Sequence, residues 1–112
     1  MATIAACESA LHELARRLAD ADPARRKKAD FERTLTCTLR DLQVTFAGQL
    51  HDARLTDIRQ VDNRDAQIRM AMSSDDLIAM VAGQLSMASA WATGRVKIEA
   101  GVFDLLKLRA LF

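Results

Sequence analysis

The sequence of 112 residues has no tyrosine, a single proline, four glycines and only two cysteines. Cys7 and Cys37 form no Cys-x-x-Cys pair and have no histidine at ligand spacing, which excludes a zinc ribbon and a dithiol redox motif built from them. The lack of tyrosine removes one common general acid. No repeat, linker or low-complexity segment interrupts the chain, so we expect one domain over residues 1–112.

Charge of one sign is also lacking, because 16 lysines and arginines nearly balance 15 aspartates and glutamates, for a net charge of +1. Such a chain has no overall field to attract nucleic acid or an acidic membrane. The densest basic run, Arg25 to Lys28, is interpreted as the solvated face of a short helix. Weak contact with anionic lipid headgroups is the alternative, so we expect at most transient membrane contact and no nucleic acid.

Long hydrophobic runs are absent as well. The most apolar stretch, residues 77–92, is interrupted by glycine, glutamine and serines and is too short to span a bilayer. The first ten residues include Glu8 and lack the basic start of a signal peptide, and the C-terminal Leu-Arg-Ala-Leu-Phe is not a peroxisomal signal. We therefore expect a cytoplasmic protein, in which both cysteines are buried thiols in a reducing compartment.

No arrangement of side chains points to catalysis. His12 and His51 are far apart and are expected at the surface. No glycine-flanked nucleophile or glycine-rich phosphate loop occurs. Asp75 and Asp76 adjoin a serine pair and point about 100° apart on a helix, so they are interpreted as helix-capping acids. The sequence therefore predicts neither an enzyme nor a metal site or cofactor.

The apolar residues that are present follow a helical period at the start of the chain. A stripe at three- and four-residue steps predicts an amphipathic helix that ends near Asp20. Asp22 and Pro23 are typical of a helix start and predict a short second helix over 23–30. The stripe consists of Ile4, Cys7, Leu11, Leu14 and Leu18.

A period of two follows and predicts strands. Residues 34–40 and 42–46 alternate apolar and polar, and we expect them to form a hairpin joined at Arg40-Asp41. Gly48 marks a bulge or a turn. Residues 49–62 are ambiguous, because Ile58 breaks the parity of Ala53 and Leu55, which favours an edge strand with a bulge. After a turn cluster at 62–65, residues 68–72 alternate as a further strand.

The remaining elements are two helices, a strand and a final helix. Ser73 to Asp76 open a helix that Gly83 ends, and a shorter one follows over 86–93. Residues 95–99 alternate as a last strand. The segment 102–112 is apolar nearly all round, so we expect this helix to be covered on more than one side. The order predicts an α+β fold with helices on one sheet face.

Methionines gather in one part of the chain: Met70, Met72, Met80 and Met87 lie within eighteen residues. Methionine adapts its shape and is suited to promiscuous apolar pockets. An ordinary hydrophobic core would use the same residues, and the same two interpretations hold for Trp91 on its short helix.

Residues 66–112 resemble the C-terminal half of sterol carrier protein type-2 domains. The family pattern is a strand, a Ser-acid-acid cap, a helix that ends in glycine, an alanine-rich helix, a Gly-Lys/Arg-hydrophobic-Lys-Ile-Glu-Gly strand and an apolar helix that ends Lys-Leu-x-x-Leu-Phe. The last glycine of the strand motif is displaced here by one residue, to Gly101 after Ala100. These elements correspond here to Met70–Asp76, Leu77–Gly83, Met87–Thr93, Gly94–Ala100 and Val102–Phe112.

The resemblance implies a twisted, five-stranded, mostly antiparallel sheet with helices packed on one face. It also implies an apolar cavity between sheet and helices, partly closed by the C-terminal helix, that binds a fatty acyl chain, sterol or similar lipid for transfer or presentation. The residues implied to bind lipid are Phe46, Met70, Met72, Leu77, Met80, Val81, Met87, Trp91, Ile98, Leu105, Leu108 and Phe112.

A second interpretation is that the chain has the same fold but no open cavity. The domain would then be a non-catalytic interaction or scaffolding module, accessory to a partner enzyme, with a filled pocket. The apolar final segment could pack on that partner or on a second copy as a homodimer. The sequence does not name the ligand, although a composition rich in alanine and arginine is typical of a bacterial source with a GC-rich genome.

Overall fold

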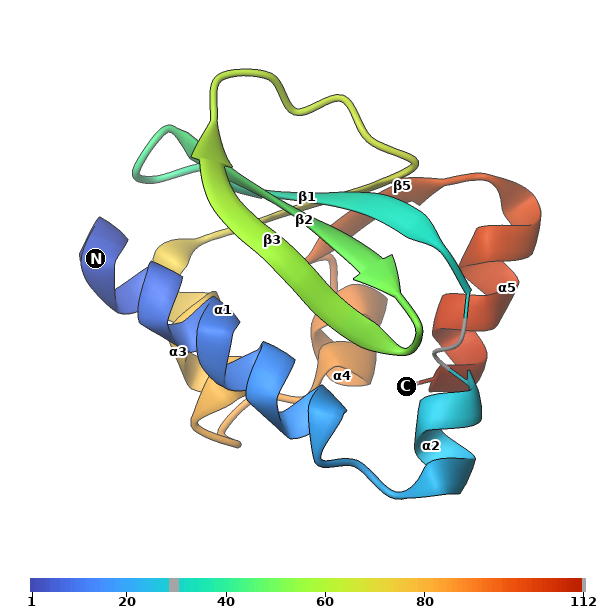
Figure 1. The fold of residues 1–112 in the computed structure, drawn as a ribbon. Coiled ribbons are helices and arrows are strands. Elements are labelled where there is room, and N and C mark those ends of the chain that lie inside the picture. The colour runs from blue at the N-terminus through green and yellow to red at the C-terminus, as the bar shows by residue number, and fades with distance from the viewer. Residues whose placement is uncertain (29–30, 112) are drawn as a thin grey trace.

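A computed structural model describes residues 1–28 and 31–111 of the chain (Figure 1). The elements in chain order are α1 (Ile4–Ala19), α2 (Pro23–Lys28), β1 (Arg33–Leu39), β2 (Val44–His51), β3 (Arg54–Val61), β4 (Ile68–Met72), α3 (Ser74–Val81), α4 (Met87–Ala92), β5 (Lys97–Ala100) and α5 (Val102–Leu111). The predicted order of elements is confirmed. The last two residues of the predicted second helix, 29 and 30, lie outside the described residues.

The strands form one sheet in the order β3-β2-β1-β4-β5. β1 runs parallel to β4, and the other three neighbouring pairs are antiparallel. The helices gather on one face of the twisted sheet, and the β3–β4 connection arches over the other face (Figure 1). The predicted α+β class, with a mostly antiparallel five-stranded sheet and helices on one face, is confirmed.

The central strand β1 shows why the helices pack on one face of the sheet. Cys37 and Leu39 point toward them and are buried, whereas the threonines that alternate with them point to the open face. Thr36 is nevertheless only 3% exposed. The β3–β4 connection covers it and accepts a 2.8 Å hydrogen bond from its hydroxyl at the carbonyl of Arg64.

The bulge expected in the third strand is present in β3. The register with β2 shifts between Ala47 and Gln49, and Asp57 takes a left-handed backbone with φ of 57°. This extra residue lets both Leu55 and Ile58 reach the space beneath the sheet, although their spacing breaks the alternation. Gly48 lies opposite, where a Cβ atom would be 3.1 Å from Cδ1 of Leu55.

The expectation that the final helix is covered on more than one side is wrong. Val102, Phe103 and Leu106 of α5 are 72%, 80% and 59% exposed, whereas Asp104 and Leu108 are buried. The reason is its position: α5 follows an edge strand and contacts β5 and α2, so that only one of its faces is covered (Figure 1).

Candidate functional site

The start of α3 is organised by serine and aspartate side chains that the sequence predicted as a cap. Ser73 is the N-cap, and its hydroxyl oxygen accepts a 3.1 Å hydrogen bond from the amide of Asp76. Asp75 is 3.1 Å from the N-terminal amino group and Asp76 is 3.8 Å from Arg95. The two carboxylates have different partners and do not converge, as expected for capping acids rather than a catalytic pair.

The residues predicted to bind lipid lie in one apolar layer between the sheet and the helices, except that Phe112 lies outside the described residues. Five of them are buried in the core: Phe46, Met72, Leu77, Ile98 and Leu108. Six more are partly buried and pack against that core: Met70, Met80, Val81, Met87, Trp91 and Leu105. The predicted residues that the structure describes therefore belong to a single cluster.

A cleft of about 400 Å³ lies between α4 and α5. The described residues that line it are Ala88, Trp91 and Ala92 of α4 and Arg109 of α5. The α4 residues occupy one helix face at three- and four-residue spacing. Of the residues predicted to bind lipid, only Trp91 is among these. The small alanines and the charged Arg109 carry no signal of an apolar site on their own, so sequence reasoning missed them.

A second, much smaller space of about 50 Å³ lies beneath the sheet on the α1 side. Phe46 and Met70 line it together with residues that were not predicted, among them Leu11, Leu55 and Ile58. Water takes about 30 Å³ per molecule in the liquid, so this space is too small for a lipid. Met72, Leu77 and Leu108 are not among the lining residues of either space; they fill the core.

Polar contacts hold α5 in place as one wall of the cleft. Nε of Arg33 lies 3.0 Å from Oδ1 and 2.9 Å from Oδ2 of Asp104, and the hydrogen bond raises the pKa of Arg33. The ring of Phe31 lies beneath two cations, Arg33 at 5.8 Å and Lys107 at 5.0 Å from its centre. Sequence reasoning missed this anchor because Arg33 and Asp104 are distant along the chain.

The grooves on the open face of the sheet are different in character. One of about 310 Å³ is lined by residues that include Thr34, Gln49, Asp57 and Arg59, and another of about 180 Å³ by residues that include Arg69 and Glu99. Charged and hydroxyl groups in these walls favour water over a hydrocarbon chain. The cleft between α4 and α5 is therefore the better candidate site for an apolar ligand.

The two cysteines are free thiols in the core, as predicted. Burial, and to a lesser extent the neighbouring Cys7, raise the pKa of Cys37 to about 12. Burial also raises the pKa of Cys7, with a contribution from the carboxylates of Asp41 and Asp75. Because the thiolate is the reactive form, neither cysteine is suited to nucleophilic or redox chemistry.

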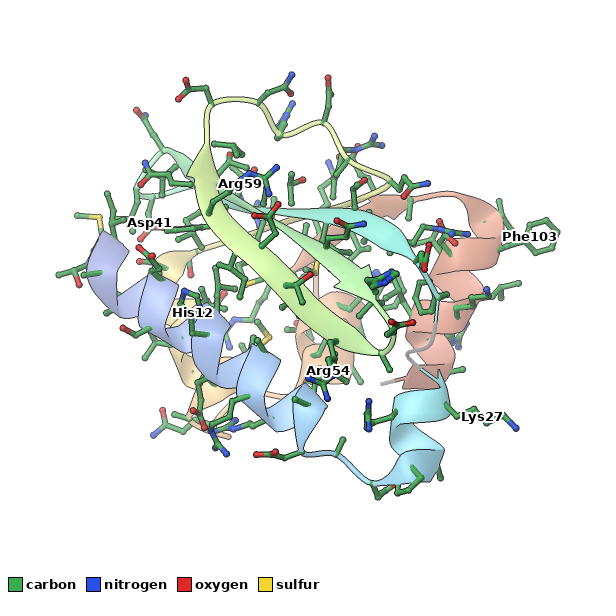
Figure 2. All side chains as sticks on the ribbon, viewed as in Figure 1. His12, Lys27, Asp41, Arg54, Arg59 and Phe103 are labelled. Atoms are coloured by element: carbon green, nitrogen blue, oxygen red, sulfur yellow. The ribbon has the colours of Figure 1, made fainter. Side chains whose placement is uncertain are left out.

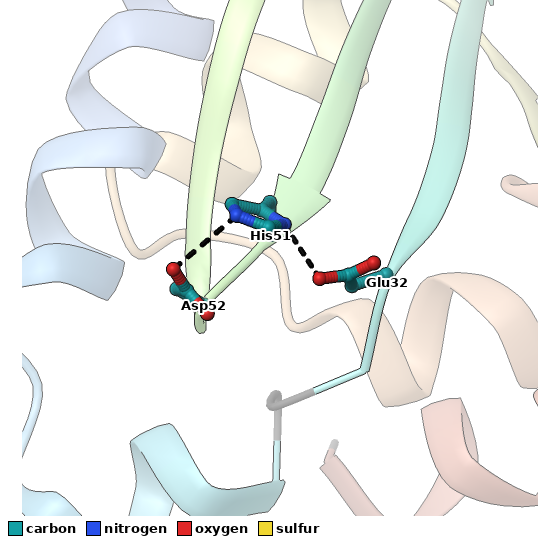
Figure 3. Close-up of side chains that lie close together, drawn as sticks. All are labelled: Glu32, His51 and Asp52. Carbon is teal, nitrogen blue, oxygen red and sulfur yellow. Dashed lines mark ion pairs between the residues drawn. The ribbon is translucent and has the colours of Figure 1, made fainter.

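His51 lies between two carboxylates at the β2–β3 turn (Figure 3). Its Nδ1 is 2.7 Å from Glu32 and its Nε2 is 3.2 Å from Asp52. In the described part of the chain, this is the group in which three possible metal ligands come within 4.8 Å of one another. Each ring nitrogen faces a different carboxylate and all three side chains are exposed, so we interpret the group as a surface ion-pair network. His12 is also exposed, and both histidines lie at the surface as predicted.

Searches against known proteins identify relatives with the same fold. A family model described as the SCP-2 sterol transfer family matches residues 3–112. The crystal structure of a sterol carrier protein 2 is 18% identical, with a TM-score of 0.68 over 92% of this chain and 90% of that one. The sterol carrier protein 2 of Aedes aegypti in complex with palmitate is 20% identical, with a TM-score of 0.60 over 98% and 94% of the two chains.

A larger protein contains a similar part. The stereoselective inverting sec-alkylsulfatase Pisa1 from Pseudomonas sp. is 27% identical, with a TM-score of 0.61 over 88% of this chain. The chain spans only 15% of that sulfatase. No curated protein matches the sequence. Because the family model covers nearly the whole chain, and sterol carrier protein structures share its fold, this chain belongs to the SCP-2 sterol transfer family.

Proposed function

We propose that the domain binds an apolar ligand, such as a fatty acyl chain, a sterol or a similar lipid, between its sheet and its helices, for transfer or presentation. The observation that carries the proposal is the cleft of about 400 Å³ between α4 and α5. Ligand sites in proteins commonly measure roughly 300 to 1,000 Å³. Membership of the SCP-2 sterol transfer family, and the palmitate complex of one relative, support the same class of ligand.

The cleft offers different chemistry at different points of its wall. The indole of Trp91 and the methyl groups of Ala88 and Ala92 present apolar surface, and Arg109 contributes a cation. A hydrocarbon tail would lie along α4, with its polar head toward the guanidinium. Burying about 300 Å² of hydrocarbon contributes roughly 7 kcal/mol at about 25 cal/mol/Å². Lost ligand freedom offsets several kcal/mol, so we expect micromolar, loosely selective binding.

The predicted lipid-binding residues that are only partly buried would form the deeper wall. Met80, Met87 and Leu105 pack against the core without being enclosed by it. Methionine has three rotatable bonds and changes shape at little cost. Rotation of these side chains would extend the cleft inward when a ligand enters, whereas Leu77 and Leu108 would form its floor.

The experiment is to extract the purified protein with organic solvent, identify co-purified lipids by mass spectrometry, and titrate delipidated protein with a fluorescent fatty acid. Ala88→Trp places an indole in the cleft and should abolish both signals. Ala5→Trp makes the same change at an exposed position of α1 away from the cleft and should retain them. Absence of co-purified lipid and of probe uptake in the folded wild type would refute the proposal.

A second candidate function is an accessory, non-catalytic module of a larger enzyme, and the alkylsulfatase favours it. In that protein a region similar to this chain occupies a small share of a much longer polypeptide. A module of this kind would use the same fold with its apolar space filled. The lipid titration separates the two candidates, because a filled pocket takes up no probe. Both candidates agree with a cytoplasmic setting, which the buried free thiols support.

A further inference from the structure

The outer face of α5 carries a patch of large apolar side chains. Val102, Phe103 and Leu106 are 72%, 80% and 59% exposed. At 3.6 residues per turn, these positions and Ala110 fall within an arc of about 100°. They therefore form one continuous strip, which we call the α5 strip. Exposed patches of this kind mark contact surfaces more often than scattered apolar residues do.

Cations border the α5 strip on both sides. Helical spacing places Lys107 at one edge and Arg109 at the other, and both are exposed. The helix has one acid, Asp104, which lies on the opposite face, is buried, and pairs with Arg33. The exposed surface of α5 thus combines apolar side chains with positive charge and has no exposed carboxylate.

The neighbouring helix α2 adds an exposed cation, Lys27, to this positive surface. Its sequence is Pro-Ala-Arg-Arg-Lys-Lys, and it packs beside α5. Lys27 and Phe103 project from the same side of the molecule (Figure 2). Two of the acids that flank α2 are engaged elsewhere, Asp20 with Arg16 at 3.1 Å and Glu32 with His51 at 2.7 Å. Of the basic side chains of α2 and α5 that the structure describes, Lys27, Lys107 and Arg109 are exposed and Arg26 is partly buried.

We propose that the α5 strip and α2 form a docking surface for an anionic lipid bilayer. Apolar side chains that insert among lipid headgroups, with lysine and arginine around them, are the pattern by which short helices bind membrane interfaces. A second protein fits less well, because a stable interface takes roughly 20 to 30 residues from each side. The α5 strip has three large side chains. No described helix is long and apolar enough to cross a membrane, so the contact is at the surface.

The docking surface adjoins the cleft. Arg109 both borders the α5 strip and lines the cleft between α4 and α5. A domain that rests on a bilayer through the α5 strip would have one wall of the cleft at headgroup level. A lipid tail could then pass between bilayer and cleft with little exposure to water. This step rests on the proposed lipid-binding function, whereas docking itself does not.

The test is co-sedimentation with vesicles of phosphatidylcholine containing phosphatidylglycerol, compared with vesicles of phosphatidylcholine alone. We expect the wild type to bind the anionic vesicles, and binding to weaken with added salt. The double variant Phe103→Ser, Leu106→Ser should lose at least tenfold in partition, and Lys27→Glu roughly fivefold. All three positions are exposed, so folding is retained.

Two matched controls test whether vesicle binding depends on the α5 strip and Lys27 in particular. Ile4→Ser removes an exposed apolar side chain from α1, and Lys97→Glu makes the same charge change on the open face of the sheet. Both should bind as the wild type does. Failure of the wild type to bind anionic vesicles overturns the proposal, as does equal weakening by Lys27→Glu and Lys97→Glu. A dimer in sedimentation equilibrium that the double serine variant dissociates would assign the α5 strip to a second copy instead.

A separate readout distinguishes this proposal from lipid binding itself. Uptake of a fluorescent fatty acid from solution needs the cleft and not the α5 strip, so the double serine variant should retain it. Vesicle binding without fatty acid uptake would leave the docking surface standing and refute the proposed function. Fatty acid uptake without vesicle binding would support the proposed function and refute the docking surface.

Discussion

Ser74 donates two hydrogen bonds to the carboxylate of Asp41. Its backbone amide lies 2.8 Å from Oδ1, and its hydroxyl lies 2.5 Å from Oδ2. Ser74 is fully buried, and its hydroxyl oxygen also accepts a 3.0 Å hydrogen bond from the amide of Ala2. The side chain of Ser74 thus joins the β1–β2 turn, the start of α3 and the segment that leads into α1.

Replacing Ser74 should therefore destabilise the fold. Ser74→Ala removes a buried hydroxyl that has two partners, and a loss of about 1 to 2 kcal/mol in the free energy of unfolding is expected. Urea denaturation measures it. Ser9→Ala, at an exposed position of α1, is the control and should change stability by less than about 0.5 kcal/mol. Equal stability of the two variants would contradict this role of Ser74.

The same contact predicts a pH dependence. The hydrogen bonds from Ser74 lower the pKa of Asp41. A folded-state pKa below the unfolded value means that this stabilisation is complete above the ordinary aspartate pKa of about 3.9. It is lost as the pH falls through the lowered folded value. The stability difference between the wild type and Asp41→Asn should be constant above about pH 5 and should shrink below about pH 4. A stability difference between the wild type and Asp41→Asn that grows as the pH falls would contradict a lowered pKa of Asp41.

Because both thiols are buried, we expect them to react slowly with a thiol reagent. Because burial raises the pKa of Cys37 to about 12 and also raises that of Cys7, neither is a thiolate at pH 8. A thiol reagent should label neither cysteine in the native protein on the time scale of minutes, and both in denaturant. Labelling of either residue at the same rate in native and denatured protein would show that it is accessible.

Trp91 provides a direct test of the cleft. It is the single tryptophan and lines the cleft, so its emission should shift to shorter wavelength when a fatty acid binds. Trp91→Ala should weaken binding about tenfold, since loss of part of a large ring contact costs about 1.4 kcal/mol. Trp91→Phe should retain most of the affinity. Phe103→Ala, on the α5 strip outside the cleft, should bind as the wild type does; equal weakening by Trp91→Ala and Phe103→Ala would argue against the cleft.

Local pattern was sufficient for most of the architecture. The Cys7 and Leu11 stripe predicted α1, and the alternation around Cys37 predicted β1. The disturbed parity at Ile58 indicated the bulge that the structure places at Asp57. These features depend on side-chain periods of 3.6 and 2, which neighbours in sequence determine.

The candidate site was predicted less completely. Hydrophobic character and the family resemblance identified the apolar layer, and Trp91 within it. They did not separate residues that fill the core, such as Leu77, from those that border empty space. Ala88 and Arg109 line the cleft although neither is a typical pocket residue. Whether a side chain borders a cavity depends on how the helices pack against each other, which no local pattern specifies.

The sequence by itself determined the elements, their order and the family, because these follow from periodicity, capping residues and the motifs of residues 66–112. Only the tertiary structure decided how far each helix is covered. The final helix looked apolar all round, yet its place beside an edge strand leaves Phe103 80% exposed. It also decided the long-range contacts, such as those of Arg33 with Asp104 and of Asp41 with Ser74. Such pairs form only when the sheet and the helices bring distant segments together.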